Sequence, residues 1–477
     1  MKDKKLILAL VCLLLIFSNL ATYHYTRNSG NSSAEKDLFY HDSGGQVEET
    51  EPEELKLFVK IFNLLQNRYL EKVPPEVMIK GAIDGMIKSL GDPYTYFMDK
   101  DELENLFIQT TGTFSGIGIE VTLVDDRVTI IAPIKGSPGE KVGLLPGDQI
   151  LALDGNSIEG VSLVEAVRMI RGAEGTKVAL TVKREGLKEL LQFDVTRENI
   201  RLETVHYEVM EGNIGYIIVT NFDEHTGMYF KKALEKLEEA GIKGLILDFR
   251  DNPGGLLQGG IEMAEEIVPS GPITYTVDGD GEITRTYYSY AKAKDYPTAV
   301  LVNAYTASTA EIVAGALQDS GGAVLVGEPT FGKATVQHIE QFYGEDVGLR
   351  YTVAKYLTPC KNDLSKKGLQ PDLFEELPEI FKYYRYPFTR DLRRGDYGED
   401  VLYLQKMMEF LGYQGGAEGI FDDKTEENLK GFQKDNGLNP DGLFTRHTAR
   451  KLRSRVEEVL LQHDTQLQMA VKYMSRE

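Results

Sequence analysis

The stretch from Asn303 to Gln337 places the tightest constraint on how this chain folds. An apolar, strand-like run at 299–302 leads into a turn of small residues, which brings Ser308 to the start of a helix with one apolar face. A second strand is predicted at 323–327, and the β-branched segment 333–339 is predicted as a third. Further strand-then-helix units precede this stretch, and their repetition predicts an α/β core.

Three side chains of this stretch suggest a chemistry. A hydroxyl at a helix start, such as that of Ser308, lies beside unpaired backbone N–H groups, where an oxyanion would be stabilised. With a period of two, Lys333, Thr335 and Gln337 point to one face of their strand. Lysine takes a proton from serine only where desolvation keeps its amine neutral, and the Gln337 amide could hold that amine in line. The structural alternatives are a helix N-cap for Ser308 and a solvated strand face for the Lys–Gln pair.

The motifs in this stretch resemble a known signature. TASTAE, at 306–311, and FGKATVQ, at 331–337, are similar to the S/T-A-S-A-S-E and F/Y-G-K-G-x-V-Q motifs of the C-terminal processing (tail-specific) proteases. In that family the lysine follows the serine by 25 positions and the glutamine follows the lysine by four, as they do here. The resemblance implies that Ser308 is the nucleophile, Lys333 the general base and Gln337 the residue that orients it. Thr309, Ala310 and Ala334 depart from the signature, and Thr306 and Thr309 are alternative nucleophiles with a poorer spacing.

A second motif, DFRDNPGG at 248–255, follows an apolar strand. Read by itself it is a tight turn in which glycine lets the backbone approach another group closely. It resembles the D-L-R-x-N-P-G-G motif of the same proteases, which implies an oxyanion-hole N–H from Gly254 or Gly255. The backbone N–H of Thr309 would be the partner donor. The sequence does not choose between the two glycines.

Residues 111–197 resemble a PDZ module. Within FSGIGIEV, four residues would present backbone N–H groups to the carboxylate of a peptide C-terminus, and the peptide would add as a strand: Gly116, Ile117, Gly118 and Ile119. A helix at 162–171 is predicted to line the other side of the groove, and Arg168 on it could touch a carboxylate or the body of the protease, although a solvated arginine is the simpler interpretation. The GxG pattern could also suggest a nucleotide loop, but no βαβ unit surrounds it.

Composition narrows the function classes. A length of 477 residues suggests about three domains, and 42% hydrophobic residues can form sizeable cores. A net charge of −21, with no basic stripe, argues against nucleic acid as a partner. The two cysteines form no disulfide framework, and the scattered histidines show no metal-ligand spacing, so we expect no metal or other cofactor.

The two ends of the chain suggest targeting and docking. Residues 1–21 combine lysines with an apolar run and indicate a signal peptide or signal anchor, so we expect the catalytic part in the cell envelope, outside the cytoplasm. Residues 390–453 resemble a three-helix peptidoglycan-binding domain, for which docking or dimerisation is an alternative role. The helix predicted at the C-terminus, 454–477, is amphipathic and favours pairing with a second copy in a homodimer.

Together these features predict a multidomain α/β protein. The resemblance implies a protease core related to ClpP and crotonase, acting on protein or peptide substrates with C-terminal tails, in envelope maintenance or spore development. Two competing functions are a catalytically decayed PDZ and wall-binding scaffold, supported only by the altered motif positions, and an acyl-CoA enzyme, which the targeting segment and PDZ module do not favour. The predicted segments are a signal or anchor at 1–21, an acidic linker at 22–54, a helical region at 55–108, the PDZ domain at 109–197, the protease core at 198–380, the peptidoglycan-binding-like domain at 390–453 and the C-terminal helix at 454–477.

Overall fold

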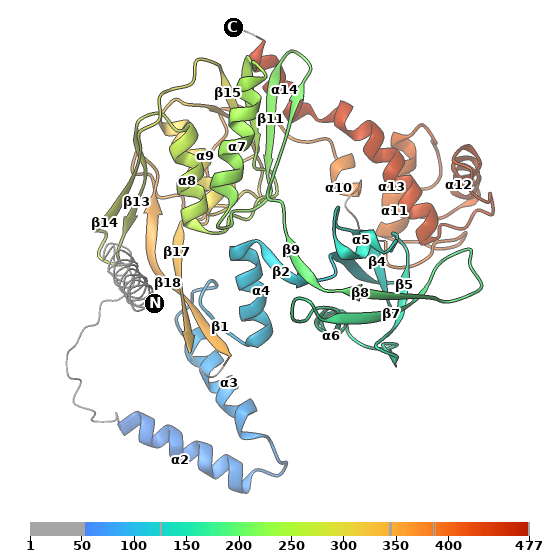
Figure 1. The fold of residues 1–477 in the computed structure, drawn as a ribbon, viewed down its shortest axis with the longest axis horizontal. Coiled ribbons are helices and arrows are strands. Elements are labelled where there is room, and N and C mark those ends of the chain that lie inside the picture. The colour runs from blue at the N-terminus through green and yellow to red at the C-terminus, as the bar shows by residue number, and fades with distance from the viewer. Residues whose placement is uncertain (1–52, 125, 343–345, 385, 387, 476–477) are drawn as a thin grey trace, which may run out of the picture. The chain divides into compact units, whose positions relative to one another are not determined.

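The computed structural model describes residues 53–475 with short gaps at 125, 343–345, 385 and 387 (Figure 1). The predicted signal or anchor and nearly all of the acidic linker lie outside the described residues. The chain divides into two units at Ala82 and Ile83, and each is described by itself. Among the described residues, every helix is too short or too polar to span a bilayer.

The region predicted to be helical, 55–108, begins with two helices. Helix α2 spans Glu53–Arg68, and helix α3, Pro75–Lys88, continues into the second unit. Apolar side chains of α2 are exposed to solvent along its length, including Leu57, Ile61 and Leu64. The periodicity that predicts these helices is therefore present, but α2 buries no residue.

The predicted protease core is built on a six-stranded sheet in the order β10-β11-β12-β15-β16-β19. All neighbouring strands are parallel except β10 and β11. Their bounds are β10 Val205–Met210, β11 Ile214–Val219, β12 Gly244–Asp248, β15 Thr298–Val302, β16 Val324–Gly327 and β19 Leu373–Phe374. Helices α7 (Thr226–Glu239), α8 (Leu257–Ile267) and α9 (Thr309–Asp319) lie beside this sheet in Figure 1.

Strand alternation sorts the core into two clusters on opposite faces of this sheet. Leu247 and Val300 join the cluster that contains side chains from α7, α8 and α9. Ile246 and Leu301, their neighbours along the strands, join a cluster with the last helix of the chain. Strands buried on both faces read as continuous apolar runs, and this burial explains the strand prediction at 299–302.

A second, antiparallel sheet carries the segment that follows Lys333. Its order is β1-β18-β13-β14, and β17 also pairs with β18. The strands are β1 Tyr96–Met98, β13 Gly271–Val277, β14 Ile283–Ser289, β17 Thr335–Phe342 and β18 Val347–Leu357. Because β1 joins this sheet, the Asp-Pro turn that precedes it, at 92–93, lies beside the middle of β18: the Thr352 hydroxyl donates to Asp92 at 2.6 Å.

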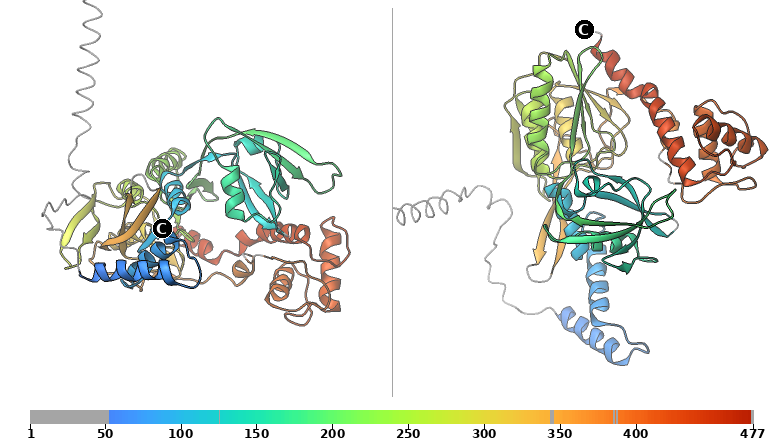
Figure 2. Two further views of the ribbon diagram at one scale, coloured as in Figure 1. Left: turned by 90° about the horizontal axis from the view of Figure 1, so that it is seen from below. Right: turned by 45° about the vertical axis from the view of Figure 1, so that its right-hand side comes forward.

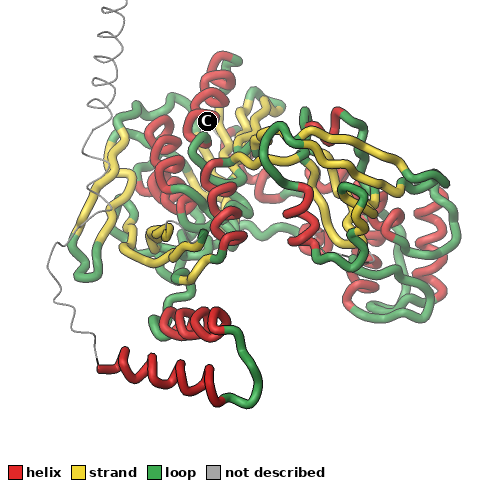
Figure 3. The backbone as a smooth tube through the Cα atoms, turned by 60° about the horizontal axis from the view of Figure 1, so that its bottom comes forward, coloured by secondary structure: helices red, strands yellow, loops and turns green. Residues whose placement is uncertain are grey.

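The predicted PDZ module is β-rich and contains two helices. Its strands are among those drawn in yellow in Figure 3. Its main sheet has the order β3-β4-β5-β7-β8, with β6 paired to β5, and a separate β2–β9 ribbon connects it to the core. The elements are β2 Thr113–Gly116, β3 Ile119–Val124, β4 Arg127–Pro133, α5 Pro138–Lys141, β5 Gln149–Leu153, β6 Asn156–Ser157, α6 Leu163–Ile170, β7 Lys177–Lys183, β8 Leu191–Thr196 and β9 Glu198–Arg201. Helix α4, Lys100–Thr111, precedes the module.

The C-terminal module is helical and has a core of its own, which includes Leu404, Met407 and Phe432 as predicted. Its helices are α10 Ile380–Tyr384, α11 Glu399–Phe410, α12 Asp423–Asp435 and α13 Arg446–Leu460. The predicted multidomain α/β architecture, with an inserted β-rich module and a helical C-terminal module, is confirmed.

The C-terminal segment, predicted as one amphipathic helix at 454–477, differs from that prediction, and the pairing with a second copy stays a prediction. The segment is two helices, because α13 ends at Leu460 and α14 (Thr465–Met474) begins after a 3₁₀ turn, Leu461–His463. The apolar side chains Leu467, Ala470 and Met474 pack against the core sheet of this same chain. Both views of Figure 2 show this red segment running from the helical module to the core. The amphipathic pattern predicted that an apolar surface covers one face of this segment, and the core sheet of the same chain provides such a surface.

Candidate active site

Ser308 sits at the junction of a strand and a helix in a strained backbone conformation. It follows β15 and caps α9, with φ 57° and ψ −120°. A non-glycine residue in this region of conformational space persists only where its surroundings hold it there, and such residues cluster at functional sites. The opposing turn is equally tight, since a Cβ added to Gly254 would lie 2.7 Å from the Ser308 Cβ. The predicted placement of Ser308 at a helix start is confirmed.

A buried carboxylate, that of Glu311, joins the Ser308 segment to the Lys333 segment. One carboxylate oxygen accepts the backbone N–H groups of Ser308 at 2.8 Å and Lys333 at 2.9 Å. The other accepts the Thr330 hydroxyl at 2.5 Å and the Gly332 N–H at 2.7 Å. Burial raises the pKa of Glu311, and these four hydrogen bonds oppose that rise. Glu311 was not predicted as a site residue, although the S-x-x-E spacing of a capping box was present in the sequence.

The Lys333 side chain is half-buried, and its burial acts on the charge of the amine. Burial, and secondarily the positive charge of Arg350, lowers the pKa of the Lys333 amine to about 8. The amine lies 4.9 Å from the centre of the Tyr94 ring. The Tyr356 hydroxyl donates both to the Lys333 carbonyl and, at 3.1 Å, to the Ser308 carbonyl. Tyr356 and Glu311 therefore hold the backbones of Ser308 and Lys333 next to each other.

Gln337 is placed differently from the expectation that it faces the Lys333 amine. Its amide nitrogen donates to the Thr335 hydroxyl at 2.7 Å, and its oxygen accepts from Arg350 at 3.2 Å. Two features break the period-two pattern: Lys333 precedes β17, and the register with β18 shifts between Val336 and Gln337. The structure thus brings Gln337 to Arg350, the residue whose charge acts on Lys333.

Two backbone N–H groups next to Ser308 are available to an oxyanion. In the described residues, those of Thr309 and Gly255 donate to no protein acceptor, whereas the Gly254 N–H donates to the Asn252 side chain at 2.8 Å. Gly255 has φ 138°, and a Cβ there would lie 2.2 Å from the Phe222 carbonyl oxygen, so only glycine fits. The motif at 248–255 therefore reaches Ser308, as the resemblance implied.

The hydroxyls of the two alternative nucleophiles, Thr306 and Thr309, both donate to backbone carbonyls. The Thr306 hydroxyl is fully buried and donates to the Phe249 carbonyl at 2.8 Å. The Thr309 hydroxyl donates to the Gly255 carbonyl at 2.9 Å. In the described residues the Ser308 hydroxyl donates to no acceptor, so its proton is the one that a base could take.

The predicted carboxylate loop lies between β2 and β3. Gly116 ends β2, Ile119 begins β3, and Gly118 has φ 68°. The carbonyls of Ile117 and Gly118 accept the N–H groups of Gly139 and Ile134, each at 2.8 Å, so the loop is fixed from one side.

Arg168 and Arg171 on α6 differ in their surroundings. The side chain of Arg168 is 65% exposed, with Glu165 at 3.8 Å. Arg171, one turn on, donates to Asn105 of α4 at 3.2 Å and lies 5.4 Å from the centre of the Phe114 ring. It is Arg171, rather than Arg168, that contacts the segment outside the module.

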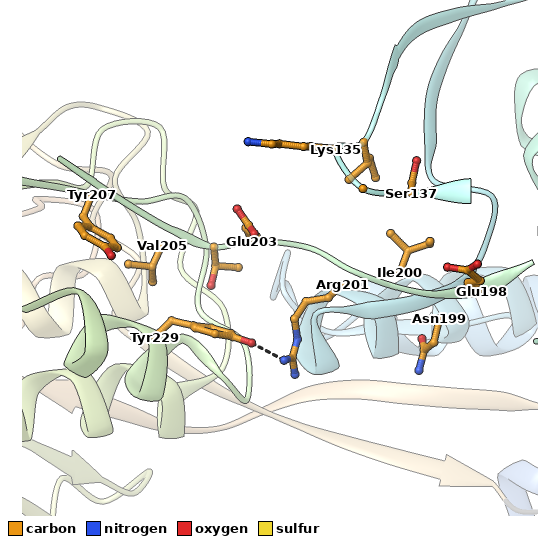
Figure 4. Close-up of a pocket in the computed structure, with 13 residues that line it drawn as sticks. Lys135, Ser137, Glu198, Asn199, Ile200, Arg201, Glu203, Val205, Tyr207 and Tyr229 are labelled. Carbon is orange, nitrogen blue, oxygen red and sulfur yellow. Dashed lines mark hydrogen bonds between the residues drawn. The ribbon is translucent and has the colours of Figure 1, made fainter. Parts of the chain in front are cut away.

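A cavity of about 460 Å³ lies where the PDZ module meets the core (Figure 4). It is lined by Lys135 and Ser137 of the module, by residues of the connecting segment 198–205, and by Tyr229 of α7. Arg201 donates to the Tyr229 hydroxyl across one side. None of the lining residues belongs to the loops of Ser308, Glu311 or Lys333, so this cavity is separate from the candidate catalytic centre.

Models of protein families match four segments of this chain. Peptidase family S41 matches residues 213–374, and a PDZ domain family matches 129–184. The family described as the activating protease CtpB N-terminal domain matches 15–102, and a peptidoglycan binding domain family matches 397–452.

Curated relatives match nearly the whole chain. Carboxy-terminal processing protease CtpA of Bacillus subtilis is 37% identical, over 88% of this chain and 90% of the relative. CtpB of the same organism is 36% identical, over 87% of each chain. A "Probable CtpA-like serine protease" of Staphylococcus aureus is 32% identical, over 92% of this chain and 88% of the relative. A solved photosystem II D1 C-terminal processing protease is 28% identical, over 69% of this chain and 95% of that chain, with a TM-score of 0.41.

Proposed function

Because the chain belongs to peptidase family S41, the carboxy-terminal processing serine proteases, we propose that Ser308 and Lys333 form its catalytic pair. The observation that carries the proposal is the shared anchoring of the two residues. The same Glu311 oxygen accepts both of their backbone N–H groups, and the Tyr356 hydroxyl donates to both of their carbonyls. An amine whose pKa is lowered to about 8 is a competent base for a serine hydroxyl once the two side chains meet.

The reaction then follows from the groups present. The neutral Lys333 amine takes the proton of the Ser308 hydroxyl as its oxygen attacks the peptide carbonyl carbon. The negative charge that forms on the carbonyl oxygen is stabilised by the N–H groups of Thr309 and Gly255; we choose Gly255 because the Gly254 N–H is already bonded to Asn252. The protonated lysine gives its proton to the departing amine, and water releases the acyl group from Ser308.

Gln337 acts on this pair through Arg350 in the geometry observed. Its amide oxygen holds the guanidinium that helps to lower the pKa of Lys333. Direct orientation of the amine, the role that the family resemblance implies, requires the amide to leave Thr335 and Arg350.

The rate of cleavage should follow the charge of Lys333. Since the amine must be neutral to act as base, we expect kcat/KM to rise about tenfold per pH unit below 8 and to level off above it. Hydrolysis of a fluorogenic peptide between pH 5.5 and 10 measures this profile. A rate that is flat over this range, or that falls between pH 6 and 8, would exclude Lys333 as the base.

The substrates and the regulation are inferred from the remaining modules. The PDZ module receives the C-terminus of a protein tail at residues 116–119, and its occupancy controls cleavage at Ser308. The N-terminal segment directs the protein to the cell envelope, as a secreted or anchored form, and the C-terminal module docks on peptidoglycan. The direct test is cleavage of unfolded casein by the full chain, with and without peptides that end in apolar residues. Cleavage that the peptides stimulate supports the proposal. Absence of cleavage by folded protein that still binds peptide favours the scaffold function.

Arg168 is the residue in the module that we expect to respond to the peptide. Its exposed guanidinium has a distant partner only, so it can meet an incoming carboxylate. Arg168→Ala should therefore lose the stimulation of casein cleavage by peptide. Arg171→Ala is the matched control, because Arg171 is already engaged by Asn105 and Phe114, and it should keep the stimulation. Normal stimulation of the Arg168 variant would remove Arg168 from the mechanism.

A further inference from the structure

A buried ionic cluster surrounds Arg250, at the start of the turn that carries the oxyanion-hole candidates. Its guanidinium donates to Oδ1 of Asp248 at 3.0 Å and to Oδ2 at 2.6 Å. It also contacts the Asp464 carboxylate at 2.8 Å. The side chains of Arg250, Asp248 and Asp464 are only 11%, 8% and 3% exposed. The Tyr216 hydroxyl donates to Asp248 at 2.6 Å and completes the cluster from β11.

The two carboxylates come from distant parts of the chain. Asp248 ends β12, whereas Asp464 lies 214 residues beyond Arg250, between the 3₁₀ turn and α14. Asp464 also accepts the Leu467 N–H at 2.9 Å and so caps α14. Gln466 accepts from Arg250 at 3.2 Å and donates to the Glu375 carbonyl at 2.8 Å. The beginning of the last helix is thus bonded to the core at several points.

Arg250 leads directly into the candidate catalytic turn. Asp251, in the left-handed region with φ 59°, is held by Asn303, whose side chain accepts its N–H at 3.0 Å. The side-chain oxygen of Asn252 accepts the Gly254 N–H. The backbone carbonyl of Asn252 accepts the N–H of Ala307, the residue before Ser308, at 2.9 Å. A displaced guanidinium would therefore shift the N–H groups that face the oxyanion. A small displacement of such N–H donors lowers the catalytic rate strongly, because they stabilise the oxyanion only from a fixed position.

We propose that Asp464 is a positioning residue for peptide hydrolysis, which acts through Arg250 on the turn at 250–255. The inference rests on the proposed function of Ser308. If Asp464 has this role, helix α14 contributes to catalysis, although α14 follows the peptidoglycan-binding-like module in the sequence. Without Asp464, a buried arginine keeps one of its two carboxylate partners, and burial of a partly compensated charge favours rearrangement of the loop that carries it.

The test is Asp464→Asn in the full chain, because asparagine keeps the size and the helix-capping ability of aspartate but not its charge. The fraction of protein able to react is counted by mass after fluorophosphonate labelling of Ser308, and kcat for peptide hydrolysis is expressed per reactive site. We expect kcat per site to fall about tenfold with KM within twofold. Asp422→Asn is the matched control, since Asp422 caps α12 by accepting the Thr425 N–H at 2.8 Å and lies outside the core; it should leave both constants unchanged.

Gln466→Met provides a second variant that removes a contact to Arg250 without changing charge, and kcat per site should fall in the same direction by a smaller factor. A merely structural role would lower the number of reactive sites and the Tm but leave kcat per site at the wild-type value, and that result would overturn the inference. Wild-type protein that neither cleaves peptide nor reacts at Ser308 would instead overturn the proposed function, so the two failures are distinguishable.

Discussion

Replacement of Ser308 by alanine is expected to abolish peptide cleavage while the fold survives. Loss of a catalytic serine in a base-activated pair lowers kcat by about 10⁴-fold or more, because only binding and the oxyanion hole remain. The cost to stability should be about 1 kcal/mol, the usual cost of losing a helix N-cap serine. The neighbouring threonines cannot replace Ser308, since both of their hydroxyls donate to backbone carbonyls.

Cleavage of casein and the Tm, measured together, check this expectation. Ser320→Ala is the matched control, because Ser320 is exposed at the opposite end of the same helix and its hydroxyl donates only to the Leu317 carbonyl. Its activity should equal that of the wild type. Appreciable cleavage by the Ser308 variant would show that another residue is the nucleophile.

Replacement of Lys333 by methionine should remove activity and stabilise the protein. The loss of the base should again cost about 10⁴-fold in kcat, and Lys333→Arg should not restore activity, because arginine stays protonated. The gain in stability follows from the pKa, which is about 8 in the folded chain and 10.5 ordinarily. Below pH 8 the wild type buries a charged amine at a cost that the methionine variant does not have.

The pH dependence of this gain has a definite sign. Between pH 8 and 10.5 the unfolded chain binds the proton that the folded chain has lost, so the stability of the wild type rises with pH. The Tm advantage of Lys333→Met should therefore be largest below pH 8 and shrink towards pH 10.5. Lys355→Met is the control: Lys355 lies on the adjacent strand β18, its side chain is 52% exposed, and its removal should change neither activity nor this pH dependence. An inactive variant with a lower Tm at every pH would contradict the desolvated amine.

The candidate site illustrates which inferences a sequence supports. Apolar periodicity predicted the strand and the helix that flank Ser308, because each depends on local pattern. The register shift beside Gln337 could not be predicted, since nothing in a strand sequence marks where its partner bulges. Similarly, the pattern of α14 shows an apolar face but not what covers it.

Polar contacts between residues far apart in the sequence were the hardest features to predict. Arg250 and Asp464 are ordinary charged residues until the fold brings the end of the chain against β12. Glu311 is the intermediate case: its spacing from Ser308 signals a capping box, but its bonds to Thr330, Gly332 and Lys333 depend on tertiary structure. The substituted motif positions fit their surroundings, because Ala310 and Ala334 are buried in the core, and they give no support to a decayed enzyme.

The most direct test of the Ser308–Lys333 pair is the reaction of the full chain with a fluorophosphonate, in which a serine oxygen displaces fluoride from phosphorus. We expect peptide mapping to find one adduct, on Ser308, at a rate that rises with pH through about 8 and is lost in Lys333→Met. An adduct on Thr306 or Thr309, or labelling of Ser308 at a rate independent of pH and of Lys333, would contradict it.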